Sequence, residues 1–196
     1  MRHQPWKRWI VLLVLCVASG SASAHQGHDL SGFAVGFSHP FTGLDHLLAM
    51  VAVGLWAACG GSRKVWLLPA TFMTSMVASA ALVVLTHFPP SLEAGIAASV
   101  MVLGLVTALS LQLPAMLSLS IAALSGALHG AAHGMEIPAS AAPLSYALGF
   151  LAATVALHAA GVTFGLSSGN RSLPLARMAG VAIAMSGAWM LSGAMA

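Results

Sequence analysis

The sequence predicts an all-α polytopic membrane protein with six transmembrane helices after a cleaved N-terminal signal peptide. Of its 196 residues, 59% are hydrophobic and only 6% are charged, and the mean hydropathy is +0.92. Soluble domains carry about 25% charged residues and could not bury this much apolar surface. The apolar residues also fall into runs near the roughly 20 residues that a membrane span needs. We therefore expect a signal peptide at residues 1–24 and a single six-helix transmembrane domain at residues 25–196.

The first 24 residues have the three parts of a secretory signal peptide. Positive residues stand at its start, Ile10–Val17 is apolar, and Ala22-Ser23-Ala24 is a small-residue cleavage site. Cleavage would leave Cys59 as the only cysteine and so exclude a disulfide framework. The new N-terminus would carry His25 and His28 beside a free amine. Such a tip is either a gathering point for a divalent cation or a polar tail without a specific role.

Six apolar runs follow the signal peptide, separated by short turns rich in Gly, Pro, Ser and Asn. Several of the runs are rich in Ala, Gly and Ser, which favours close packing of one membrane helix on another. We expect the spans to cover residues 43–59, 65–86, 93–111, 114–134, 144–166 and most of the chain from 174 onward.

The positive charges agree with an orientation set by the signal peptide. A cleaved signal leaves the mature N-terminus outside, which makes the first and fifth loops cytoplasmic. The four remaining positive residues, Arg63, Lys64, Arg171 and Arg177, lie in or beside those two loops. They are too few for a nucleic-acid-binding patch, although the sequence pI is about 9.4. We expect a multi-pass protein of a bacterial inner membrane with both mature termini in the periplasm.

The first stretch that suggests chemistry is residues 39–46, HPFTGLDH, directly before an apolar run. Aspartate and histidine are costly in hydrocarbon and are tolerated where they face a bundle interior, a wet cavity or a bound cation. Proline suits the first turn of a helix, so one arrangement to consider is a helix that starts at Pro40. His39 and His46 would then lie within about 20° of one face, with Asp45 about 100° away from His46. These three residues are candidate metal ligands; the alternative is a helix end whose histidines reach the membrane surface.

The second such stretch is residues 126–136, GALHGAAHGME. On a helix, His129, His133 and Glu136 fall within about 60° of one another, and two imidazoles at i and i+4 commonly bind a metal. The alternative is a pair of buried, hydrogen-bonded histidines that hold the bundle together. Beside these residues a ridge of small side chains recurs every four positions: Ser118, Ala122, Gly126, Gly130 and Gly134. Such a ridge permits close contact with a second helix, so we expect the site to lie at a seam between helices.

The expected topology places both motifs at the external ends of their spans. We therefore expect the first and fourth spans to be neighbours, with side chains from both reaching one ion. Four imidazoles and two carboxylates suit Ni²⁺, Co²⁺, Zn²⁺ or Cu²⁺ better than Mg²⁺ or Ca²⁺. Farther along, His158 is either a second relay site or a neutral histidine bonded to a backbone carbonyl. Glu93 is expected to be a solvated charge that suits a helix dipole, and His87 to have no specific role.

The two motifs resemble the HupE/UreJ family, the hydrogenase and urease accessory permeases for nickel and, in some members, cobalt. The resemblance is carried by residues 39–50, by residues 128–136 and by the histidines of residues 25–29 that follow the signal. It implies uptake of Ni²⁺ or Co²⁺ across the inner membrane for metalloenzyme maturation. We expect this uptake to be secondary or facilitated, with no permanently bound cofactor. The metal-handling positions that it implies are His39, Asp45, His46, His129, His133 and Glu136.

Two other classes of function stay open at this point. An intramembrane metal-dependent hydrolase would use Glu136 as its general base, but the ligands here outnumber those of a three-ligand catalytic zinc site. A metal-binding subunit of an ATP-driven importer would need a separate ATPase, because the sequence has no G-x-x-x-x-G-K-[ST] phosphate loop. We expect a protein that is not an enzyme, whose partners are a divalent metal ion and membrane lipid. A homo-oligomer and a monomer are both compatible with the sequence.

Overall fold

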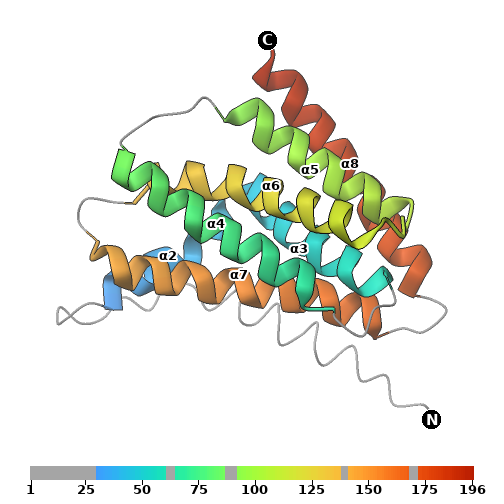
Figure 1. Ribbon diagram of the computed structural model, residues 1–196, viewed down its shortest axis with the longest axis horizontal. Helices are drawn as coiled ribbons and strands as arrows, with labels where there is room; N and C mark the ends of the chain where they lie inside the picture. Colours follow the sequence, from blue (N-terminus) through green and yellow to red (C-terminus); the bar gives the residue numbers. More distant parts are fainter. Residues whose placement is uncertain (1–29, 61–64, 87–91, 138–140, 168–171) are drawn as a thin grey trace.

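The computed structural model describes residues 30–60, 65–86, 92–137, 141–167 and 172–196, and this part of the chain is all helical (Figure 1). The all-α prediction is therefore confirmed for these residues. The signal peptide, His25, His28 and His87 lie outside them. The helices are α2 (Leu30–Thr42), α3 (Leu44–Cys59), α4 (Leu67–Thr86), α5 (Glu93–Ala108), α6 (Ala115–Met135), α7 (Pro143–Leu166) and α8 (Ser172–Ala194).

Several helices are long and apolar enough to cross a membrane. α4, α6, α7 and α8 each meet both criteria, and α2 with α3 meets them as a pair that is bent by 82°. α5 has 16 residues and is shorter. Large apolar side chains face outward, with Leu85 and Leu144 80% and 73% exposed, as expected where lipid covers the surface. The described residues thus form a multi-pass helical membrane protein with four or five candidate spans.

The helix of the first span starts at Leu44, close to the expected bound at residue 43, and not at Pro40. Pro40 lies inside α2, and the break comes at Gly43, whose backbone is extended (φ −95°, ψ 115°). α2 is a separate helix because it packs on α7 through glycines that allow the two backbones to touch. His39 and His46 therefore lie on two helices rather than on one face. The bend between these helices nevertheless brings the two imidazole rings to a centroid distance of 6.5 Å.

The ridge of small residues on α6 packs against α4, the second expected span, rather than against α3. A Cβ on Gly126 would overlap the carbonyl oxygen of Phe72, and a Cβ on Gly130 would overlap that of Met76. The contacting residue numbers rise together on the two helices, from Gly126 with Phe72 to Gly130 with Met76, so α4 and α6 run parallel, as Figure 1 also shows. The prediction that the ridge permits close helix packing is confirmed. The helix that packs against the ridge is α4, however, and not the first span.

α3 is the most buried helix of the described bundle, with ten of its residues buried. It runs parallel to α7, because Gly54 lies against Gly161 and, farther toward the C-terminus of both helices, Gly165 lies against Ala58. The α5–α8 pair lies on the other side of α3 (Figure 1). The N-terminal ends of α3 and α7 therefore meet the C-terminal end of α6 at one end of the bundle.

Candidate metal centre

Four histidines from three helices gather at this end of the bundle. The ring centroid of His46 on α3 is 4.0 Å from that of His133 and 4.8 Å from that of His129, both on α6. The ring of His39 on α2 is 5.0 Å from that of His133. The residues of the two sequence motifs thus lie together, although they are about 90 residues apart in the chain. Their role as metal ligands stays a prediction.

Asp45 holds the imidazole of His46. Its Oδ1 lies 2.6 Å from His46 Nδ1 and 2.9 Å from the backbone nitrogen of the same residue. The first turn of a helix leaves N–H groups without helical partners, so a carboxylate here accepts from both donors. Although Asp45 is about 100° away from His46 around the helix, its carboxylate therefore turns back and supports the His46 ring. Because the carboxylate can only accept, Nδ1 is the donor, and in the neutral imidazole the lone pair is then on Nε2, the arrangement that orients metal-binding histidines.

Ser99 of α5 fixes the ring of His129. Its hydroxyl donates to the carbonyl of Ile96 at 2.7 Å and lies 3.0 Å from His129 Nε2. A carbonyl can only accept, and serine has one proton to donate. His129 Nε2 must then be the donor to Ser99, which leaves the lone pair on Nδ1. Sequence reasoning missed Ser99, because it is a single serine on a different helix and belongs to no motif.

Glu136 joins His133 and His39 at the open edge of the cluster. Its Oε2 lies 3.1 Å from His133 Nδ1 and 3.1 Å from His39 Nε2. These two hydrogen bonds, from His133 and then from His39, hold the pKa of the Glu136 carboxyl well below its usual value. One ligand atom from each of the three residues lies within 4.8 Å of the others, so they form a possible outer metal position. His133 donates through Nδ1 and keeps its lone pair on Nε2.

Three buried lone pairs result from these contacts. His46 Nε2, His129 Nδ1 and His133 Nε2 have no hydrogen-bond partner among the residues that the structure describes. Leaving a buried polar atom unpaired costs about 1–3 kcal/mol, so three such atoms in adjacent rings call for a ligand. Imidazole nitrogens suit Ni²⁺, Co²⁺, Cu²⁺ and Zn²⁺. The described residues whose ligand atoms lie close enough together to hold an ion are His39, His133 and Glu136, and the rings of His46 and His129 adjoin them with unpaired nitrogens.

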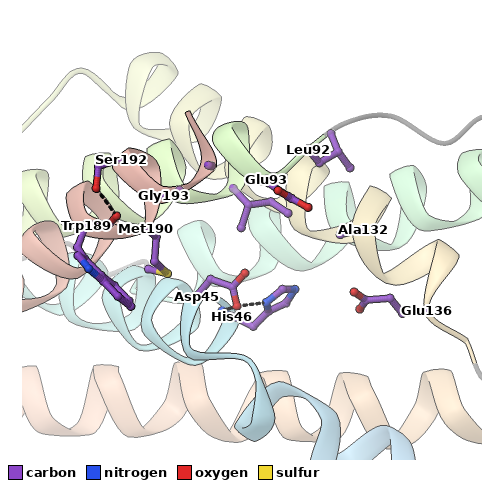
Figure 2. A pocket seen from close by; sticks show the side chains of 13 residues that line it. Asp45, His46, Leu92, Glu93, Ala132, Glu136, Trp189, Met190, Ser192 and Gly193 are labelled. Carbon is purple, nitrogen blue, oxygen red and sulfur yellow. Dashed lines mark hydrogen bonds and ion pairs between the residues drawn. The ribbon is translucent and has the colours of Figure 1, made fainter. Parts of the chain in front are cut away.

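A cavity of about 630 Å³ adjoins the cluster. Figure 2 shows Asp45 and His46 in its middle, with Glu136 on the α6 side and Trp189 and Met190 of α8 opposite. Glu93 at the start of α5 also lines this cavity, so its prediction as a charge that only suits the helix dipole is incomplete. The expected topology, which placed Glu93 at the same external end as both motifs, was the signal that could have found it. Three carboxylates thus line the approach to the histidines.

His158 of α7 lies apart from the four clustered histidines. Its Nδ1 donates to the carbonyl of Thr154 at 2.9 Å, as one of the two sequence interpretations expected. Its side chain is fully buried. The second nitrogen, Nε2, has no partner in the part of the chain that the structure describes. The hydrogen bond to Thr154 therefore satisfies only one of the two ring nitrogens of His158.

Comparison with known proteins agrees with the two histidine motifs. The model of the family described as HupE / UreJ protein matches residues 13–190. The chain belongs to the HupE/UreJ family. It is also 40% identical over 175 residues to "Protein HupE" of Rhizobium leguminosarum bv. viciae, an alignment that covers 88% of this chain and 91% of the relative. No solved structure matches the chain. The predicted resemblance is confirmed, and with it membership of a transporter-type family of accessory proteins.

Proposed function

We propose that this HupE/UreJ protein is a secondary or facilitated permease that takes up Ni²⁺, and also Co²⁺, for the maturation of hydrogenase or urease. The family is associated with nickel and cobalt uptake accessory to these enzymes. The ion is the transported substrate, and no permanently bound cofactor is needed. In this proposal the protein resides in the inner membrane as six spans after cleavage of residues 1–24, with both mature termini periplasmic.

One observation carries this proposal: three neighbouring imidazoles of α3 and α6 each keep a buried lone pair. Each of these rings is oriented by a different side chain: His46 by Asp45, His129 by Ser99 and His133 by Glu136. Orientation by such outer partners is typical of metal-binding histidines. The carboxylate-lined cavity beside the rings supports entry of a cation from one side.

The geometry is less favourable to an intramembrane hydrolase. Glu136 is the candidate general base for that reaction, and its Oε2 already accepts hydrogen bonds from two histidines. Because these bonds keep the pKa of Glu136 low, its carboxylate is a weak base. We therefore assign Glu136 a part in holding the ion and its ligands.

Uptake of radiolabelled Ni²⁺ and Co²⁺ by cells that express only this protein tests the proposal. The unmodified protein is expected to raise uptake, and His46→Ala and His133→Ala are each expected to abolish it at unchanged membrane abundance, because each removes an imidazole from the cluster. His87→Ala, outside both motifs, serves as the matched histidine control and should leave uptake unchanged. Normal uptake by both cluster variants would reject the site.

A further inference from the structure

The fully buried His158 has a nitrogen that the proposed site does not use. Because Nδ1 donates to a carbonyl, which can only accept, the lone pair of this imidazole is on Nε2. That atom is buried and unpartnered within the described residues. The three lone pairs of the outer cluster are likewise buried and without a hydrogen-bond partner among the described residues. A purely structural histidine gains nothing from leaving this nitrogen unpaired.

His158 lies deeper in the bundle than the cluster does, by two separate measures. Along α7, it follows Phe150 by eight residues, and Phe150 contacts the ring of His133 at a centroid distance of 4.2 Å. Along α3, Gly54 follows His46 by eight residues and lies against the backbone carbonyl of His158. Eight helical residues correspond to about 12 Å. Measured along α3 and along α7, His158 therefore lies at the same depth, about 12 Å beyond the cluster.

One aromatic ring lies between the cluster and this deeper histidine. The ring centroid of Phe72 on α4 is 5.7 Å from that of His129 and 5.4 Å from that of His158. Phe72 is fully buried. Its backbone is held against Gly126 of α6, so the position of the ring is set by the glycine ridge.

We propose that His158 is an inner station for the transported ion and that the ring of Phe72 is the closed barrier between it and the outer cluster. This inference rests on the proposed permease function and deepens it. An apolar ring at this place keeps the two stations from communicating freely, as a carrier requires. When the ring turns aside, the ion leaves His129 for the lone pair of His158 Nε2. The face of the ring also attracts a passing cation, which lowers the cost of transfer.

The first test separates binding from transport. Ni²⁺ is added as the chloride to purified full-length protein for equilibrium binding, and to proteoliposomes that contain a nickel-sensitive dye for uptake. His158→Asn keeps an N–H for the carbonyl of Thr154 but removes the Nε2 lone pair. It is expected to bind Ni²⁺ within about threefold of the unmodified protein, since the outer cluster is intact, and to lose at least tenfold in uptake. Phe164→Leu, on the exposed side of α7, is the control and should change neither.

The second test addresses the barrier and does not depend on transport. His158→Cys is made in a Cys16→Ser, Cys59→Ser background and treated with a small membrane-impermeant thiol reagent from outside. Labelling is expected to be slow with Phe72 present. It is expected to rise at least tenfold with Phe72→Ala, and Ni²⁺ should protect the thiol in that variant.

The outcomes separate this inference from the proposed function. Wild-type uptake by His158→Asn, loss of Ni²⁺ binding in that variant, or equal labelling with and without Phe72 would each overturn the inner station or its barrier. If the unmodified protein gives no uptake, the permease proposal itself fails, and normal uptake by both His46→Ala and His133→Ala would reject its outer site. Labelling in the second test would still report on the barrier in that case.

Discussion

Two faces of α6 lie side by side and differ in what they contact. One face consists of glycines that touch the backbone of α4, and the other carries His129 and His133 toward His46 of α3. The glycine face has no side chain to move, so any added atom must separate two backbones. The histidine face is held by side-chain hydrogen bonds, which can be removed one at a time. Changes on the first face should therefore affect folding, and changes on the second should affect the ion.

The largest expected effect is on the glycine face. Gly130→Val would place two methyl groups where even a Cβ overlaps the carbonyl of Met76. We expect a loss of about 3 kcal/mol or more in folding free energy, which corresponds to a fall of about 10 °C in unfolding temperature. Thermal unfolding of the detergent-purified protein, monitored by size-exclusion chromatography, measures the fall in unfolding temperature. Gly193→Val is the control, because nothing lies within 4 Å of a Cβ at Gly193. Equal stability of the two variants would contradict this account of the α4–α6 seam.

A smaller effect is expected where the histidine face is supported. Asp45→Asn removes the carboxylate beside His46 Nδ1, and Ser99→Ala removes the partner of His129 Nε2. Loss of such outer partners typically weakens metal binding 10- to 100-fold. We expect Asp45→Asn near the upper end and Ser99→Ala near the lower end, because the bond to a carboxylate is the stronger of the two. Isothermal titration with Ni²⁺ gives both constants, and unfolding temperatures within about 3 °C of the unmodified protein would show that the fold is kept. Unchanged affinities would mean that these groups do not orient ligands.

The order and approximate bounds of α3 to α8 could be predicted because they depend on local information. Apolar runs and Gly- or Pro-containing turns determine where these helices begin and end. α2 could not be predicted as a separate helix, because Pro40 is compatible both with a helix start and with a place inside a helix, and the break at Gly43 is seen only in the structure. The partner of the glycine ridge could not be predicted either. Small residues show that a contact exists and do not specify which helix makes it.

Like the fold, the candidate site has parts that could be predicted from the sequence and parts that could not. The histidines and carboxylates of the two motifs could be found by their spacing, and the expected topology brought them to one end of the bundle. The roles of Asp45 and Ser99 could not be found, because each depends on a hydrogen bond. Asp45 folds back onto the first turn of α3, and Ser99 reaches His129 from another helix, 30 residues away in the chain. Nothing in the sequence distinguishes Phe72 from the other apolar residues of its span, since its position beside two histidines exists only after α4, α6 and α7 pack together.

The smallest expected effect is at Gly43, where the backbone and the histidine face meet. A Cβ at this position would lie 2.9 Å from Asp45 Oδ1 and 3.1 Å from His46 Nδ1. The backbone of Gly43 is extended, so alanine can adopt its conformation, and only the two side chains must shift. Gly43→Ala should therefore lengthen the bond between Asp45 and His46 and weaken Ni²⁺ binding by about 3- to 10-fold, which is less than the 10- to 100-fold loss for a removed outer partner because the bond is only lengthened. The unfolding temperature should stay within about 2 °C of the unmodified protein, in contrast to Gly130→Val. Gly60→Ala is the control, since its Cβ would be 3.6 Å from the nearest atom. A Gly43→Ala variant that binds normally would show that the Asp45–His46 pair can shift without cost, and that the orientation of His46 has another source.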